Sequence, residues 1–305
     1  MQTTDRVLMV RPVRFAFNEE TASNNAFQQK SDTMDAALAI QRQAVEEFDG
    51  YVALLRSHGV MVDVLQDTPE PFTPDSIFPN NCFSTHLDAD GRRTLVLYPM
   101  YARNRRWERD KLRTLLDRMP MDRVVDLTCK EQYNRFLEGT GSLILDRDHR
   151  MAYACLSPRT DAEVLREWAQ VMDYDYFAFC SEDEQGTPVY HTNVVMHVGT
   201  RFAIVCMESV KDAAQRATLR HLLEKNGKEV VDISFEQMHR FAGNMLELRN
   251  AEGEKLLVMS AIARQSLTTQ QVDLLEQDVR IVAPAIPAIE TAGGGSARCM
   301  IAEEF

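Results

Sequence analysis

Residues 222–248 read LLEKNGKEVVDISFEQMHRFAGNMLEL, and this stretch contains the repeating unit that decides the fold. Its two leucines end an amphipathic helical pattern, Asn226-Gly227 is typical of a turn, and Val230–Ile233 is an apolar run of strand length. A polar loop then leads to a second apolar run at Met245–Leu248. The stretch therefore predicts a helix end, a buried strand, a loop and the first strand of a hairpin.

The same order of elements recurs along the chain. Further pairs of leucines precede a turn and a strand at Leu54-Leu55 and Leu274-Leu275, and a weaker copy runs from Trp168 to Phe179. After each strand, two apolar runs flank a tight polar turn, which is typical of β-hairpins. The predicted hairpins pair residues 82–86 with 94–98, 143–145 with 151–155, 194–198 with 202–207, and 245–248 with 256–259.

The last unit is incomplete at the carboxyl terminus. Cys299–Glu303 forms its first hairpin strand, and the chain then ends. The amino-terminal run Val7–Val13 can supply the missing strand, which places both termini in one unit. We therefore predict an α/β fold, a five-bladed propeller that forms a single catalytic domain over residues 1–305. An ordinary open α/β sheet is the alternative.

Local signals refine this prediction. Thr160-Asp161-Ala162-Glu163 and Thr268-Thr269-Gln270-Gln271 both match the capping box that starts helices. Four cysteines inside strand-like stretches are expected to be buried, and they are Cys82, Cys155, Cys180 and Cys206. The chain has no CxxC pair, which favours a reducing, cytoplasmic location.

Composition narrows the classes of partner. The net charge of −12 argues against nucleic-acid or anionic-membrane binding, and a small-molecule substrate is expected instead. No run approaches the roughly 18 apolar residues of a membrane span, and no secretory signal is visible. No histidine or cysteine pair has the spacing of zinc ligands, and Gly293-Gly294-Gly295 lacks the lysine of a phosphate loop. We therefore expect no metal and no cofactor, and homo-oligomerisation stays open.

The loops that enter the hairpins carry the candidate functional residues. Corresponding positions are about 50 to 60 residues apart, at Asn81, Gly141, Asn193, Asn244 and Cys299. Asn80, Glu138 and His191 lie in the same loops. Equivalent loops of a ring converge on its axis at one end. These distant residues are therefore expected to share one pocket.

Three of these residues suggest nucleophilic catalysis. Cys299 follows three glycines and Ser296-Ala297, where the backbone can make close approaches and the thiol can act as a nucleophile. His191 is the matching candidate for general acid and base, and Glu138 is a carboxylate in a loop. Each has a structural alternative: a glycine-rich turn, a hydrogen-bonded loop histidine, and a carboxylate that accepts from backbone donors.

Together these features resemble the pentein fold of arginine deiminases, amidinotransferases and dimethylarginine hydrolases. The resemblance covers almost the whole chain: five units, a late cysteine after a glycine-rich loop, a His-x-Asn element and a Glu-Gly element. It implies that Cys299 is the nucleophile and His191 the general acid and base. Glu138 would then hydrogen-bond the substrate nitrogens or orient the histidine.

Two departures from arginine deiminases bear on the substrate. Where that family has aspartates, this chain has Asn81, in Phe78-Pro79-Asn80-Asn81, and Asn193, in His191-Thr192-Asn193. A carboxylate matches the cationic guanidinium, whereas an amide offers a donor and an acceptor and suits a neutral ureido group. With Arg11-Pro12 and Ala292–Cys299, these elements are most similar to the citrulline utilisation hydrolase branch, which implies citrulline as substrate.

The implied reaction begins with Cys299 thiolate, paired with a cationic His191, attacking the ureido carbon. Asn80, Asn81, Asn193 and Glu138 would hold the substrate, and Arg11, Arg14 and Arg298 are candidates to bind its carboxylate. An S-carbamoyl intermediate would yield ornithine, ammonia and carbon dioxide, with the order of the departing nitrogens left open.

Other functions remain as alternatives. Arginine deimination, double hydrolysis of an arginine-type substrate, and amidino transfer all use a guanidinium substrate. A binding protein without chemistry would not need Cys299, His191 and Glu138 together. A papain-like protease would have its cysteine near the amino terminus and its histidine downstream, the reverse of the order here.

Overall fold

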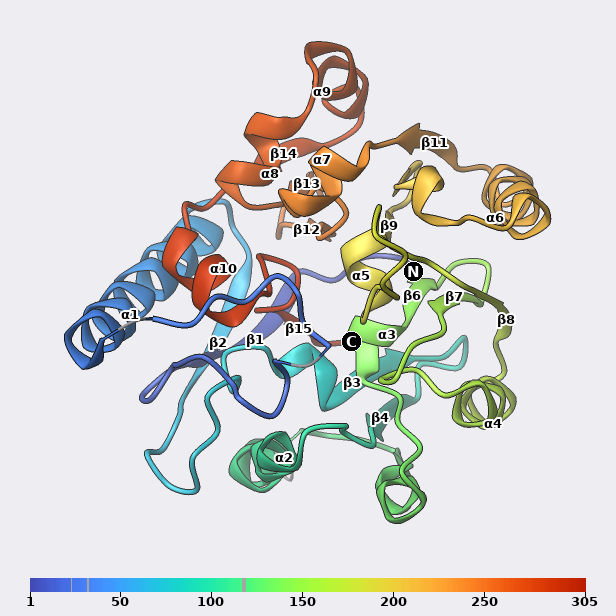
Figure 1. Ribbon diagram of the computed structural model, residues 1–305. Helices are drawn as coiled ribbons and strands as arrows, with labels where there is room; N and C mark the ends of the chain where they lie inside the picture. Colours follow the sequence, from blue (N-terminus) through green and yellow to red (C-terminus); the bar gives the residue numbers. More distant parts are fainter. Residues whose placement is uncertain (23, 32, 117–118) are drawn as a thin grey trace.

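Five small sheets surround a common axis in the computed structural model, which describes residues 1–22, 24–31, 33–116 and 119–305 (Figure 1). Each sheet has three strands, and helices lie at the outer ends of the sheets (Figure 1). In every sheet the middle strand pairs antiparallel with one neighbour and parallel with the other. The predicted five-bladed α/β propeller is confirmed.

The first blade contains β1 (Arg6–Arg11), β2 (Met61–Gln66), β15 (Ala302–Glu303) and the outer helix α1 (Met34–Ser57). The second contains β3 (Phe83–Leu87), β4 (Arg93–Leu97), β5 (Arg123–Asp126) and α2 (Arg103–Leu116). The third contains β6 (Ile144–Asp146), β7 (Met151–Cys155), β8 (Asp175–Phe179) and α4 (Ala162–Met172).

The fourth blade contains β9 (Met196–Val198), β10 (Phe202–Val205), β11 (Glu229–Asp232), α6 (Ala213–Lys225) and α7 (Phe235–His239). The fifth contains β12 (Leu246–Arg249), β13 (Lys255–Val258), β14 (Arg280–Val282), α8 (Ala261–Ser266) and α9 (Thr269–Leu275). Four short helical segments lie closer to the axis, and they are η1 (Pro79–Asn81), α3 (Gly139–Ser142), α5 (Thr192–Val195) and α10 (Pro287–Gly293) (Figure 1).

The ring closes through the two chain ends, as predicted. β1 pairs antiparallel with β15, where Val7 faces Glu303, and pairs parallel with β2 along its whole length. Phe48, Val52 and Leu55 on α1 are buried with β1 residues in one apolar cluster. Because the strand β15 that completes the first blade begins three residues after Cys299, ring closure also restricts the position of this cysteine.

Two local predictions need correction. Thr268 begins α9 with a complete capping box, as expected, but the N-cap of α4 is Asp161 and not Thr160. The Thr160 hydroxyl instead donates to Ser142 Oγ at 2.8 Å, inside the molecule. Cys82, Cys155 and Cys206 are buried, whereas Cys180 is exposed because it follows the last residue of β8 in a surface loop.

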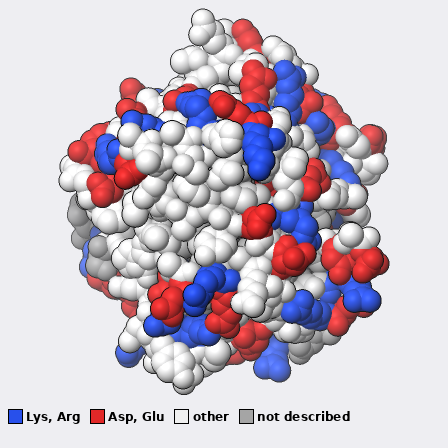
Figure 2. Space-filling view, turned by 90° about the vertical axis from the view of Figure 1, so that its right-hand side faces the viewer, with Lys and Arg blue, Asp and Glu red and all other residues white. Residues whose placement is uncertain are grey.

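The inner helical segments pack closely because glycines allow it. A Cβ atom on Gly139 would lie 2.3 Å from the Asn80 carbonyl oxygen, so α3 can touch η1 only with glycine here. Among the described residues, none of the helices combines the length and the apolar character needed to cross a membrane. On the side that carries α4 and α6, acidic and basic side chains are mixed around a broad uncharged area (Figure 2).

Candidate active site

The Cys299 side chain lies at the axial end of the fifth loop and is 4% exposed. Its Sγ atom accepts hydrogen bonds from two amides, Asn193 Nδ2 and Asn244 Nδ2, each at 3.2 Å. The orientation of Asn244 is fixed, because its Oδ1 accepts from the backbone N–H of Arg298 at 3.0 Å. Three hairpin loops therefore meet at the sulfur, as the repeat predicted.

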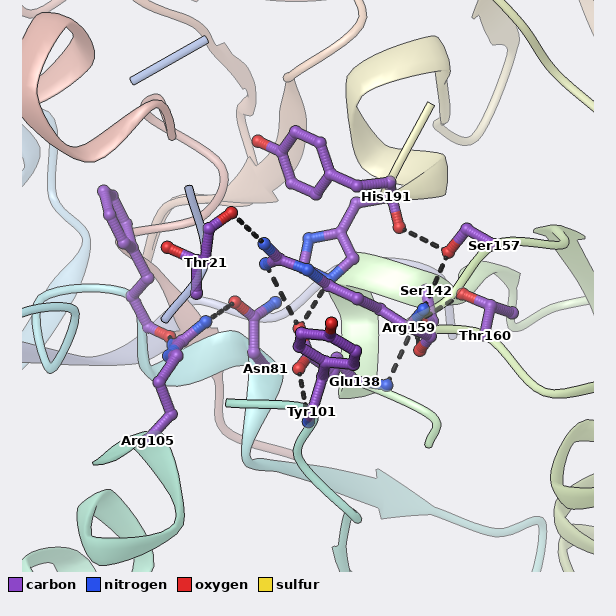
Figure 3. A network of polar contacts seen from close by, with 12 residues as sticks. Thr21, Asn81, Tyr101, Arg105, Glu138, Ser142, Ser157, Arg159, Thr160 and His191 are labelled. Atoms are coloured by element: carbon purple, nitrogen blue, oxygen red, sulfur yellow. Dashed lines mark hydrogen bonds and ion pairs between the residues drawn. The ribbon is translucent and has the colours of Figure 1, made fainter. Parts of the chain in front are cut away.

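His191 and Glu138 form the second part of the cluster. His191 Nε2 lies 2.8 Å from Glu138 Oε2, and Glu138 Oε1 accepts from the Tyr101 N–H at 2.9 Å. Arg159 Nη1 lies 3.6 Å from the same carboxylate, and the three side chains meet at the centre of a polar network (Figure 3). Glu138 thus holds the histidine ring, which is one of the two roles expected of it.

The charges in this cluster follow from burial and from the arginines. Burial alone raises the pKa of the Glu138 carboxyl, but Arg159 and His191 outweigh it and lower that pKa. Burial lowers the pKa of the His191 imidazole, although Glu138 acts in the opposite direction. The lowered pKa favours a neutral ring, which differs from the cationic His191 that the resemblance implies. A neutral ring that donates from Nε2 to Glu138 leaves Nδ1 as the base.

Asn81 is oriented by a buried arginine. Arg105 Nη1 donates to Asn81 Oδ1 at 2.8 Å, and the guanidinium is itself held by Glu108 at 2.8 and 3.0 Å. Because arginine can only donate, Oδ1 must face it and Nδ2 must face away (Figure 3). Asn81 Nδ2 is buried and has no partner among the described residues.

Two acceptors in the site are also unpaired. Asn193 Oδ1 and Asp75 Oδ1 are buried, and neither has a partner in the described part of the chain. The other Asp75 oxygen accepts from Asn18 Nδ2 at 2.7 Å. Burial raises the pKa of Asp75, which Arg105 opposes. Buried polar groups normally find partners, so this donor and these two acceptors are available to bind a ligand.

Gly141 connects the two parts of the cluster. A Cβ atom at this position would lie 2.3 Å from Asn81 Nδ2 and 2.8 Å from both Cε1 and Nδ1 of His191. The free amide and the basic nitrogen therefore face the same point on α3. Asn193, on the same short helix that His191 precedes, continues the cluster to Cys299.

A segment that we call the roof (residues 18–22 and 24–29) covers the axial end of the site. Asn25 Nδ2 donates to the Gly293 carbonyl at 3.2 Å, and the Gln29 N–H donates to Thr291 O at 2.7 Å. Arg159 Nε donates to Asn24 Oδ1 at 2.9 Å. These bonds hold the roof against the Thr291–Gly293 end of α10 and against Arg159.

The structure does not bring every predicted residue to the cluster. Arg11 pairs with Asp49 on α1, Arg14 pairs with Glu70, and Arg298 pairs with Glu303. Asn80 Nδ2 approaches Thr140 Oγ1 at 3.4 Å instead of the sulfur. The arginine beside His191 is Arg159, which sequence reasoning missed. Asp75 and Arg105 were missed as site residues too, and Asn244 was placed in the pocket without a role.

Signals for these missed residues differ. Asn244 was visible as a repeat position, and Asp75 precedes the Phe78–Asn81 element in the same loop. Arg105 and Arg159 had no signal, because each acts from a segment outside the hairpin-entering loops. No group of three or more His, Cys, Asp and Glu side chains in the described ranges is arranged to hold a metal ion.

The five blades around one axis define the fold, which is the pentein fold. The family model described as N,N dimethylarginine dimethylhydrolase, eukaryotic, matches residues 11–305, and the chain belongs to this family. It is therefore a cysteine-dependent hydrolase of C–N bonds. A comparison with curated proteins found no match.

Three solved structures illustrate the likeness of fold. The N-terminal domain of ArgZ, an arginine dihydrolase from cyanobacteria, is 16% identical, with a TM-score of 0.73 over 98% of this chain and 97% of that chain. A complex of AgrE with L-arginine is 16% identical, with a TM-score of 0.75 over 98% of this chain and 40% of that one. DDAH from Pseudomonas aeruginosa with citrulline is 13% identical, with a TM-score of 0.68 over 99% and 100%.

Proposed function

We propose that the protein hydrolyses the ureido group of citrulline to ornithine, ammonia and carbon dioxide, as a member of the citrulline utilisation branch. The observation that carries this proposal is the set of unpaired atoms. Asn81 Nδ2 offers a donor, whereas Asn193 Oδ1 and Asp75 Oδ1 offer acceptors. A ureido group has a carbonyl oxygen that accepts and nitrogens that donate, so it pairs with all three.

A guanidinium group would pair with only part of this set. It carries donors and no acceptor, so Asn81 Nδ2 would face a cation without a hydrogen bond. Arg105 holds Asn81 in this orientation, and reversing the amide would place two sets of donors against each other. An unpaired buried donor costs about 1–3 kcal/mol, which is enough to separate the two substrates by one to two orders of magnitude.

The proposed mechanism uses the neutral histidine. His191 Nδ1 takes the thiol proton as Cys299 Sγ attacks the ureido carbon, and Glu138 stabilises the imidazolium that forms. The negative charge moves to the ureido oxygen, where Asn81 Nδ2 donates to it. His191 then gives its proton to the ornithine nitrogen, the C–N bond breaks, and Cys299 keeps the carbamoyl group.

The second half-reaction releases the carbamoyl group. Neutral His191 takes a proton from water, the hydroxide attacks the thiocarbamate carbon, and the sulfur leaves as a thiolate that then takes the proton back from His191. Asn193 Nδ2 and Asn244 Nδ2 are placed to donate to that thiolate. The carbamic acid breaks down to ammonia and carbon dioxide, so atoms and charge balance.

Hydrolysis of arginine or dimethylarginine is the second candidate. The family match favours a guanidino substrate, and Asp75 provides a carboxylate for it. A dihydrolase would use the same thiol twice, first on the guanidino carbon and then on the ureido carbon. Only this dihydrolase version shares with the first candidate the steps that follow citrulline.

Separate incubations with citrulline, arginine and dimethylarginine test the proposal. Ornithine and ammonia should appear from citrulline, and a Cys299→Ala variant should produce neither. Turnover of arginine or dimethylarginine without turnover of citrulline would refute the argument from Asn81. An Asn81→Asp variant should lose activity on citrulline and shift its preference toward arginine, because a carboxylate replaces the free donor.

A further inference from the structure

A buried tyrosine joins the segment that carries His191 to the loop that carries Cys299. Tyr190 directly precedes His191 and is 5% exposed. Its hydroxyl donates to the Gly294 carbonyl oxygen at 2.6 Å, in the loop that leads to Cys299. No step of the proposed reaction uses this hydrogen bond. It nevertheless connects the part of the chain that bears the base to the part that bears the nucleophile.

Gly294 is the residue at which the chain leaves α10 and turns toward Cys299. Its φ of 62° lies in the left-handed region, and its N–H donates to the Glu290 carbonyl at 2.9 Å, which ends the helix. Farther along the loop, the Cys299 N–H donates to the Ser296 carbonyl at 2.9 Å and forms a second turn. The direction of the Gly294 carbonyl therefore affects the path of the loop up to the sulfur.

The other contacts of Tyr190 hold it beside the histidine. Its ring centroid lies 4.8 Å from that of His191, and the Arg159 guanidinium lies 4.8 Å from the same ring. Ser157 Oγ donates to the Tyr190 backbone carbonyl at 2.7 Å. Burial, together with the charge of a Cys299 thiolate, raises the pKa of the Tyr190 hydroxyl. This hydroxyl therefore stays protonated and acts as a donor, not as an acid.

We propose that Tyr190 is a positioning residue, whose hydroxyl keeps Cys299 Sγ at the distance from His191 at which the thiol proton can be transferred. Proton transfer from thiol to imidazole depends steeply on this distance. Asn81, which offers the free donor to the substrate, is oriented by a different contact, so Tyr190 should affect kcat and not KM. The inference rests on the proposed function only for its thiol and its imidazole, which hydrolysis of citrulline, arginine or dimethylarginine would use alike.

Steady-state kinetics of Tyr190→Phe test the proposal. Phenylalanine keeps the ring and its contacts and removes only the donor to Gly294. A displacement of about 1 Å in a catalytic group can lower the rate by about 10²-fold, but Asn193 and Asn244 still hold the sulfur in the variant. We therefore expect kcat to fall by about tenfold, with KM within about twofold of the parent value.

Tyr98→Phe is the matched control, because it removes the same hydroxyl from a buried tyrosine elsewhere in the core. Ser84 Oγ lies 2.7 Å from the Tyr98 hydroxyl, and Trp168 Nε1 donates to it at 3.1 Å. Losing these hydrogen bonds should lower the midpoint of urea unfolding. The kcat and KM of this variant should equal those of the parent. Urea unfolding is measured for both variants.

The outcomes separate this inference from the proposed function. A folded Tyr190→Phe protein with the parent's kcat would overturn the inference, and so would a change confined to KM. An equal loss of kcat in Tyr98→Phe, or a Tyr190→Phe protein that does not fold, would assign the hydroxyl to stability and would overturn it as well. The assay uses whichever of the three substrates the parent hydrolyses. Turnover of arginine or dimethylarginine without citrulline would therefore count against the proposed function alone, whereas hydrolysis of none would count against both.

Discussion

Gly141→Ala isolates the close approach on which the proposed site depends. Gly141 lies in α3 and its backbone is not left-handed, so alanine can adopt its conformation. The obstacle is space, because the new Cβ would lie 2.3 Å from Asn81 Nδ2 and 2.8 Å from the His191 ring. One methyl group therefore pushes on the free donor and on the base at the same time.

The size of the effect follows from these distances. An ordinary van der Waals contact needs about 3.4 Å or more between a carbon and its neighbours, so Asn81 must move by about 1 Å. A displacement of about 1 Å in a catalytic group can lower the rate by about 10²-fold. Overpacking of the buried site should also cost about 1–3 kcal/mol of unfolding free energy. We expect kcat/KM for citrulline to fall by at least about 10²-fold while the protein still folds.

The assay is the release of ornithine and ammonia, with unfolding by urea measured in parallel. Gly50→Ala is the matched control, since Gly50 lies in α1 and a Cβ there meets nothing within 4 Å. This control should keep full activity and gain stability, because alanine favours helix over glycine by up to about 1 kcal/mol. A folded Gly141→Ala protein with the parent's activity would show that Asn81 and His191 do not act where we place them.

Three other substitutions test separate parts of the site. Burial raises the pKa of Glu290 from an ordinary 4.5 to about 7, and Ser296 donates to this carboxyl at 2.6 Å. Because this pKa is raised, the free energy of unfolding is highest below pH 4.5 and falls as the pH rises to about 7, by about 3 kcal/mol. Glu290→Gln should remove this dependence on pH, as measured by urea unfolding at pH 5 and pH 8. Arg105→Met leaves the buried Glu108 carboxylate without its ion pair and should lower the free energy of unfolding by about 3–5 kcal/mol. The double variant Arg105→Met with Glu108→Met should recover stability but not activity, because Asn81 loses the donor that orients it. Asn244→Asp replaces a donor to Cys299 Sγ with an anion, so iodoacetamide should alkylate Cys299 more slowly. The exposed Cys129 and Cys180 should first be changed to serine, so that the measured rate belongs to Cys299. An unchanged rate of alkylation would contradict the contact between Asn244 and the sulfur.

The repeat made most of the fold predictable. Each leucine pair, turn and hairpin lies within about 60 residues, so local patterns were sufficient to place the five blades. Closure through β1 and β15 followed from counting strands, because one hairpin lacked its partner. Cys180 was wrongly predicted to be buried, because an apolar run in the sequence gives no sign of where the strand inside it ends. The strand β8 ends one residue before Cys180, at Phe179.

The site was predictable only where the repeat carried it. Cys299, His191, Asn193 and Asn81 occupy equivalent loops, and the structure places them in one cluster. Arg105 comes from α2, and Arg159 comes from the loop before α4, so neither shares the repeat position. Arg11 and Arg298 were candidates to bind the substrate because of their positions in the sequence. Sequence position does not show in which direction a side chain points, and in the structure both arginines form ion pairs with other residues of the protein. The burial that favours a neutral His191 could not be predicted, because no pattern in the sequence indicates how deeply this loop residue lies in the molecule.

The unpaired donor has an electrostatic origin that bears on substrate choice. Each arginine in the site is matched to a carboxylate, Arg105 to Glu108 and Arg159 to Glu138, which leaves Asp75 as the acidic group without a close ion pair. Arg105 also fixes Asn81 with its amide nitrogen toward the ligand. Two arginines thus face three carboxylates, so the charges of the site alone would favour a cationic substrate. The orientation of Asn81 acts against this preference, because a ureido oxygen can accept from its Nδ2, whereas a guanidinium has no acceptor for it. On the proposed function, discrimination between citrulline and arginine is therefore a property of the Arg105–Asn81 pair and not of Asn81 alone.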